Sequence, residues 1–177
     1  AVILEAVLLA VALWFAVVRR RGAVRLLGFF RPRGRAPYAL ALGAWLAGIA
    51  AAAIWVSAAQ ALGWGIFEPE DSARGVLDAA GGGLIVPYIV VGLFGPFCEE
   101  VFFRGFALPG LGRRFGSWRA VLLSAALFGL FHISPGLLAP TFIFGIVFGW
   151  LYVRTGSILP GIVAHSFQNI VALTLVS

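Results

Sequence analysis

The sequence predicts an all-α protein, a polytopic transmembrane bundle of about six helices around a polar intramembrane cavity. Composition is the first indication, because hydrophobic residues make up 62% of the 177 residues, charged residues make up 11%, and the mean hydropathy is +1.02. Soluble domains are nearer half apolar and a quarter charged. The second indication is that most of the charged residues lie between long apolar stretches. The polar surface that a water-soluble globule of this length needs is therefore missing.

The expected membrane helices are apolar stretches at 1–18, 38–62, 84–108, 118–133, 137–153 and 158–176. Most of them approach the ~20 residues that cross a bilayer core. Three arginines follow the first stretch where a signal peptide would have a small-residue cleavage site, so we interpret this stretch as a membrane span. Neither a soluble domain nor an internal repeat is visible. We therefore expect a single membrane domain over residues 1–177.

Arginine placement predicts the topology. The chain carries 13 basic residues, all of them arginine, and a formal charge of +6. Seven of them lie in the 19–37 loop, and the others follow or precede apolar stretches, except Arg74 and the intramembrane Arg104. Basic loops stay on the cytoplasmic side, so we place the 19–37 loop in the cytoplasm and assign no nucleic-acid role to the charge. The lipid bilayer is the expected surrounding, and a bacterial cytoplasmic membrane is the expected location.

The loop between the second and third spans is acidic. It carries Glu68, Glu70, Asp71 and Asp78 and ends in three glycines at 81–83. We expect it to be an external, flexible loop. The third span then contains Pro87 and Pro96, which should interrupt its helix.

Charged residues inside the third span are the strongest functional signal. Glu99, Glu100 and Arg104 stand in an otherwise apolar stretch, where each charge costs roughly 2.5–3.5 kcal/mol on insertion scales. Glu100 and Arg104 are four residues apart, which places them on one helical face as a structural ion pair. This arrangement leaves Glu99 free to act as a general base.

Both histidines of the chain also lie in apolar helical stretches. His132 follows Phe128 by one turn, and His165 precedes Asn169 by one turn, so each pair should share a face. An imidazole beside a carboxamide is suited to stabilise a developing oxyanion. A single intramembrane histidine is often only an interhelical hydrogen-bonding residue, but these residues together with Glu99 favour catalysis. The position of His132 near the outer end of its span fits the depth of Glu99 less well.

Small residues predict where helices approach closely. Gly145 and Gly149 form a stripe in the fifth span, and Gly43 and Gly48 are suited to the same purpose in the second. We interpret these glycines as packing positions, and the lone Cys98 as a small apolar filler.

These polar residues resemble the motifs of the CAAX-type intramembrane endopeptidases, also called the CPBP or Abi family. That family carries EExxxR, FxxxH and HxxxN motifs on separate membrane helices. The corresponding segments here are Glu99-Glu100-Val101-Phe102-Phe103-Arg104, Phe128-Gly129-Leu130-Phe131-His132 and His165-Ser166-Phe167-Gln168-Asn169. The similarity covers roughly residues 84–177, and residues 1–83 add helices and the basic loop but no motif.

The resemblance implies a hydrolase, an intramembrane protease that cleaves a protein or peptide substrate, lipidated or not, near the membrane. Glu99 and His132 would activate the attacking water, and His165 and Asn169 would stabilise the oxyanion. Glu100, Arg104 and Phe128 would support this site. The cofactor is left open: either none, which we favour, or a divalent metal such as zinc held by the glutamate and the two histidines.

Other functions remain open at this point. A non-catalytic immunity or scaffold protein of the same family, such as those associated with bacteriocin self-immunity, would retain the same residues. A transporter also buries charged residues, but it more often shows internal repeats. A haem protein with two axial histidines would leave Glu99 and Asn169 without a role.

Overall fold

The computed structural model describes residues 2–18, 27–67, 72–81 and 83–177, and within these ranges it contains helices and no strand. The all-α prediction is confirmed. The α-helices are α1 Val2–Leu13, α2 Ala36–Ala61, α3 Ser72–Ala79, α4 Ile85–Ile89, α5 Gly95–Glu99, α6 Leu108–Phe115, α7 Ser117–Phe131, α8 Pro135–Thr155 and α9 Leu159–Val176. The π-helical segments are η1 Trp14–Val18, η4 Val90–Phe94 and η5 Glu100–Ala107, and η3 Gly65–Phe67 is a 3₁₀ turn.

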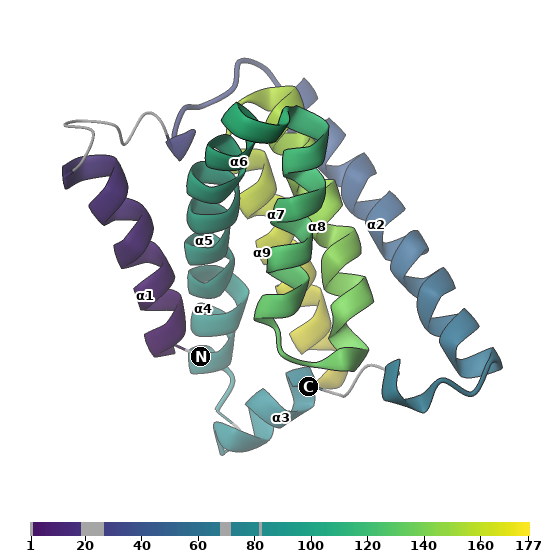
Figure 1. Cartoon of the computed structure of the whole chain (residues 1–177). Helices are drawn as coiled ribbons and strands as arrows, with labels where there is room; N and C mark the ends of the chain where they lie inside the picture. The colour runs from purple at the N-terminus through teal and green to yellow at the C-terminus, as the bar shows by residue number, and fades with distance from the viewer. Residues whose placement is uncertain (1, 19–26, 68–71, 82) are drawn as a thin grey trace.

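The six expected spans correspond to six apolar helical segments. Four of these segments are long and apolar enough to cross a membrane: Ala36–Ala61, Ile85–Phe115, Pro135–Thr155 and Leu159–Val176. The other two, Val2–Ala16 and Ser117–Phe131, are shorter apolar helices. The chain therefore forms a helical membrane bundle, as Figure 1 shows.

The third span is longer than expected. Helical structure runs without a break from Ile85 to Phe115, alternating between α and π geometry, although Pro87 and Pro96 lie inside it. Arg113 and Arg114 consequently lie in the last turn of α6 rather than in a loop. Gly116 alone separates α6 from α7, and its positive φ of 80° is a conformation that favours glycine. π-helical turns are common at functional sites, and η5 begins at Glu100.

Part of the expected flexible loop is instead the helix α3, which lies across one end of the bundle (Figure 1). Leu77 of α3 is buried, whereas Asp78 is exposed. The acidic residues Glu68, Glu70 and Asp71 lie outside the described residues.

The tightest helix packing joins α7 and α8. A Cβ atom at Gly145 would lie 2.8 Å from Cα of Ala125, and one at Gly149 would lie 3.2 Å from the Val121 side chain. The predicted packing role of this stripe is confirmed. In α2, Gly48 likewise faces Phe144, but a Cβ at Gly43 would have no neighbour within 4 Å, so the prediction for Gly43 was wrong.

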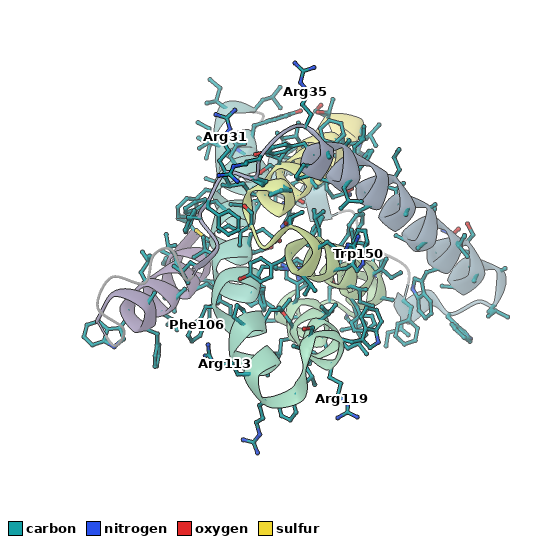
Figure 2. All side chains as sticks on the ribbon, turned by 90° about the horizontal axis from the view of Figure 1, so that it is seen from above. Arg31, Arg35, Phe106, Arg113, Arg119 and Trp150 are labelled. Carbon is teal, nitrogen blue, oxygen red and sulfur yellow. The ribbon has the colours of Figure 1, made fainter. Side chains whose placement is uncertain are left out.

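The arginine-bearing segments lie at one end of the bundle in Figure 1, and Figure 2, which is seen from above, labels Arg31, Arg35, Arg113 and Arg119. Arg31, Arg33 and Arg35 precede α2, Arg113 and Arg114 end α6, Arg119 begins α7, and Arg154 ends α8. The hydroxyl of Ser157 donates to the carbonyl of Phe30 at 2.6 Å, which fastens the segment before α2 to the α8–α9 connection. Arg74 lies in α3, at the opposite end, and Arg19, Arg20, Arg21 and Arg25 lie outside the described residues.

Candidate active site

A buried ion pair lies at the centre of the site. The Arg104 guanidinium lies 2.9 Å from Oε1 of Glu100, and both residues are 0% exposed. The predicted pairing is therefore confirmed. Arg104 also donates to the carbonyl of Gly145 at 3.3 Å and stacks over the Phe128 ring at 4.5 Å. These contacts with two other helices, α7 and α8, fix the pair within the bundle.

His165 lies between the two adjacent carboxylates. Its Nδ1 is 3.1 Å from Oε1 of Glu100, and its Nε2 is 3.4 Å from Oε2 of Glu99. The first contact is a hydrogen bond, whereas the second is longer than a good one. α9 comes this close because Gly161 has no side chain: a Cβ there would lie 2.9 Å from Oε2 of Glu100. Glu100 thus orients the imidazole, and Nε2 is the less constrained nitrogen.

Glu99 faces away from solvent, with 7% of its surface exposed. Its neighbour on the other side is Glu5 of α1, whose carboxyl group lies against that of Glu99. Two adjacent carboxyl groups can share a hydrogen bond when one of them carries a proton. Glu99 is therefore held between an imidazole and a second carboxyl group.

Glu5 is a site residue that sequence reasoning missed. It is 8% exposed, although α1 otherwise lies at the edge of the bundle (Figure 1). The available signal was a glutamate inside an apolar span, which by itself suggests a functional residue.

The Phe128 ring joins the two histidines. Its centroid is 4.9 Å from the His132 ring and 5.7 Å from the His165 ring, with edge-to-face geometry in both cases. His132 follows α7 directly, and its Nδ1 is 2.9 Å from the carbonyl of Phe128. The predicted sharing of a face by Phe128 and His132 is confirmed.

A cavity of about 470 Å³ brings together the remaining predicted residues. His132, His165 and Asn169 line it together with Phe128, and Gln168 and Thr141 add further polar groups. His132, at the end of α7, thus shares one cavity with residues in the middle of α9. Glu99 is not among the lining residues and lies on the other side of His165.

Asn169 is anchored by one of its two amide hydrogens. Its Nδ2 donates to the carbonyl of Val91 in η4 at 2.9 Å. An amide nitrogen has two donor hydrogens, so the second remains available for a group in the cavity.

The metal set implied by the resemblance does not fit this geometry. Among the described residues, no group of three histidine, cysteine, aspartate or glutamate side chains is placed to hold a metal ion. Both nitrogens of His165 face carboxylates, and Nδ1 of His132 faces a backbone carbonyl. Glu99, His132 and His165 are therefore not arranged as three ligands around one point.

Comparison with known proteins agrees with the motifs. Residues 81–171 match the family described as "Type II CAAX prenyl endopeptidase Rce1-like". The chain is 29% identical over 108 residues to a protein of Bacillus subtilis (strain 168) named "Putative membrane peptidase YdiL". This similarity covers 60% of the chain but 43% of the relative, so the chain corresponds to less than half of that protein. No solved structure matches the chain.

Proposed function

Because the chain belongs to the type II CAAX prenyl endopeptidase Rce1-like family, we propose that it is an intramembrane endopeptidase that hydrolyses a peptide bond with a glutamate-activated water. The observation that carries this proposal is the position of His165. It contacts Glu99 and Glu100 on one side and lines a cavity with His132 and Asn169 on the other. An oriented imidazole and two further polar side chains thus line one space, and the base contacts that imidazole.

In the proposed reaction, Glu99 accepts a proton from a water molecule as the water oxygen attacks the peptide carbonyl. Its Oε2 makes no hydrogen bond with the described residues and can serve as the acceptor. His132 orients the water from the cavity side. When the tetrahedral intermediate collapses, the peptide C–N bond breaks and Glu99 returns the proton to the leaving amine.

The negative charge on the carbonyl oxygen needs donors that are already in place. Glu100 fixes Nδ1 of His165, which leaves Nε2 to donate to the oxyanion once its 3.4 Å contact with Glu99 is exchanged for substrate. The second amide hydrogen of Asn169 supplies the other donor. Arg104 balances the charge of Glu100 and keeps it in position.

The experiment that tests this proposal compares cells expressing wild type with cells expressing Glu99→Gln, by quantitative mass spectrometry of new protein termini in membranes. The substitution keeps the size of the side chain but removes the base. We expect a set of termini that appears with wild type and is lost with the variant. Asp78→Asn is the matched control, because Asp78 is an exposed carboxylate outside the site and its variant should produce the wild-type set.

The sequences around such termini would also show whether cleavage requires a lipidated residue. Identical termini in wild type and Glu99→Gln, at equal protein abundance, would contradict the proposal. That result would favour the non-catalytic immunity or scaffold role.

A further inference from the structure

The arginine-bearing end of the bundle holds a cavity of about 660 Å³ that the proposed reaction does not use. It lies between the segment that precedes α2 and the end of α8. Arg31 and Arg33 line it from the first of these segments, and Arg154 lines it from the second. Phe30 and Leu40 add apolar walls beside them. Three cationic side chains from two parts of the chain therefore line one space.

The positive charge at this cavity is not balanced by a carboxylate side chain within the part of the chain that the structure describes. Of the acidic residues in the described ranges, Glu5, Glu99 and Glu100 are buried at the active site. Asp78 lies in α3, at the opposite end of the bundle (Figure 1). The cavity is thus suited to an anion that comes from outside these residues.

A second cavity, of about 500 Å³, adjoins the first, and Leu40 lines both of them. It runs along the first turns of α2, where they face α7 and α8, and every residue that lines it is apolar. Trp118 and Trp150 form its wall on α7 and α8. On the α2 side, a Cβ atom at Gly43 would have no neighbour within 4 Å, so the space beside this helix is open. We call this second cavity the apolar groove.

We propose that the two adjoining cavities bind one anionic phospholipid, with its phosphate at Arg31, Arg33 and Arg154 and an acyl chain in the apolar groove. Guanidinium groups bind phosphate through charge-assisted, bidentate hydrogen bonds. Basic pockets between membrane helices bind anionic head groups in this way. Tryptophan side chains are enriched at the level of the head groups, and Trp118 and Trp150 lie on the groove close to the arginines.

The two halves of the site together select this ligand. A soluble phosphate would leave the apolar groove empty, and a neutral lipid would leave the arginines without an anion. A phospholipid with a net negative charge has a charged end and an apolar end in the same order as the two cavities. The bilayer around the helices supplies such a molecule, and its binding does not depend on the peptidase reaction.

A lipid in this position would contact α2 on one side and α8 on the other. In its apolar stretch of 18 residues, only 11% of the residues of α2 are buried inside the protein. The lipid would therefore add contacts that hold α2 against the rest of the bundle. Because a ligand that binds the folded state stabilises it, bound lipid should raise the midpoint of thermal unfolding.

The test titrates the purified protein, in a neutral detergent, with phosphatidylglycerol or with phosphatidylcholine of the same acyl chains. Native mass spectrometry measures the fraction that carries one lipid. One variant replaces the three arginines that line the first cavity: Arg31→Gln, Arg33→Gln and Arg154→Gln. A matched control removes the same charge at the same end of the bundle, from exposed arginines outside both cavities: Arg113→Gln, Arg114→Gln and Arg119→Gln.

We expect wild type to bind phosphatidylglycerol more tightly than phosphatidylcholine and to unfold at a higher temperature when phosphatidylglycerol is bound. Each arginine near a phosphate contributes severalfold, so the first triple variant should lose at least about tenfold in affinity for phosphatidylglycerol, and the control little. Equal affinities of wild type for the two lipids, or equal losses in the two triple variants, would overturn the proposed head-group site.

A separate pair of variants tests the apolar groove. Gly43→Leu places a side chain in the open space of the groove and leaves every arginine in place. Ala53→Leu adds the same side chain at an exposed position of α2 outside the groove. We expect only Gly43→Leu to weaken binding of phosphatidylglycerol. Unchanged binding by Gly43→Leu would show that the acyl chain lies elsewhere and would overturn the proposal.

Discussion

The third span and α2 occupy different environments in the same molecule. In an apolar stretch of 18 residues, 44% of the residues are buried inside the protein in Ile85–Phe115, compared with 11% in α2. The third span carries charged side chains into the interior, whereas α2 presents apolar side chains such as Leu42, Leu46 and Ile54 outward. Burial is thus greatest where polar groups need protein partners, and least where lipid suffices.

Polar contacts nevertheless connect the N-terminal helices to the site. Trp45 of α2 donates from its indole nitrogen to the side chain of Gln168 at 2.8 Å. Glu5 of α1 contacts Glu99. The matched region, residues 81–171, thus builds most of the site, and helices outside it complete the surroundings of particular residues.

The largest effect is expected from Arg104→Leu in the packed region. Removing the guanidinium leaves Glu100 as a buried carboxylate without its cation. Breaking a buried pair in this way costs about 3–5 kcal/mol. We expect a loss of that size in the free energy of unfolding, measured by titration with a denaturing detergent and followed by tryptophan fluorescence.

Two companion variants sharpen this measurement. Arg113→Leu removes an exposed arginine from the end of α6 and should change stability little. Adding Glu100→Leu to Arg104→Leu removes both charges and should restore part of the loss. The stability losses of Arg104→Leu and Glu100→Leu are also measured separately. If the double variant lost as much stability as these two losses added together, the ion pair would not be the source of the effect.

A smaller loss is expected from Gly145→Ala, where the added methyl group would meet the backbone of Ala125. Overpacking of this kind costs about 1–3 kcal/mol. Gly43→Ala in α2 is the contrasting variant, because its Cβ has no neighbour within 4 Å. There alanine should stabilise the helix by up to about 1 kcal/mol. Changes of the same sign at both positions would show that the two regions do not differ in packing; the same detergent titration measures both.

Local patterns predicted much of this structure. The apolar stretches and the arginines between them indicated the helices, and spacing of four residues indicated the Glu100–Arg104 and Phe128–His132 contacts. These features depend on neighbours within one helix. The same reasoning did not anticipate α3, whose short amphipathic sequence lies among acidic residues and glycines that are typical of a loop.

Contacts between helices were harder to predict, because they depend on the rotation and depth of each helix in the bundle. Nothing in the spacing shows that His165 lies between Glu99 and Glu100, or that the end of α7 lines the same cavity as α9. α1 is apolar on almost every face, so its sequence does not reveal which side packs inward. Only the structure shows that its single carboxylate meets Glu99.

The last prediction concerns this contact and has the smallest expected effect. Glu5→Leu removes the group that holds one side of Glu99 and should slow the appearance of the Glu99-dependent termini by about tenfold, which corresponds to ~1.4 kcal/mol in the barrier. Glu5→Gln should keep most of the rate, because its amide can donate a hydrogen bond to the Glu99 carboxylate. The rates are compared at matched protein abundance.

Stability separates positioning from simple packing at this site. Replacing a buried polar group by leucine is often neutral or stabilising, so Glu5→Leu should unfold no earlier than wild type while cleaving more slowly. An equal rate for Glu5→Leu and wild type would show that α1 only covers the bundle. Equally slow cleavage by the leucine and glutamine variants would show that the carboxylic acid itself, rather than any hydrogen-bond donor at this position, is required beside Glu99.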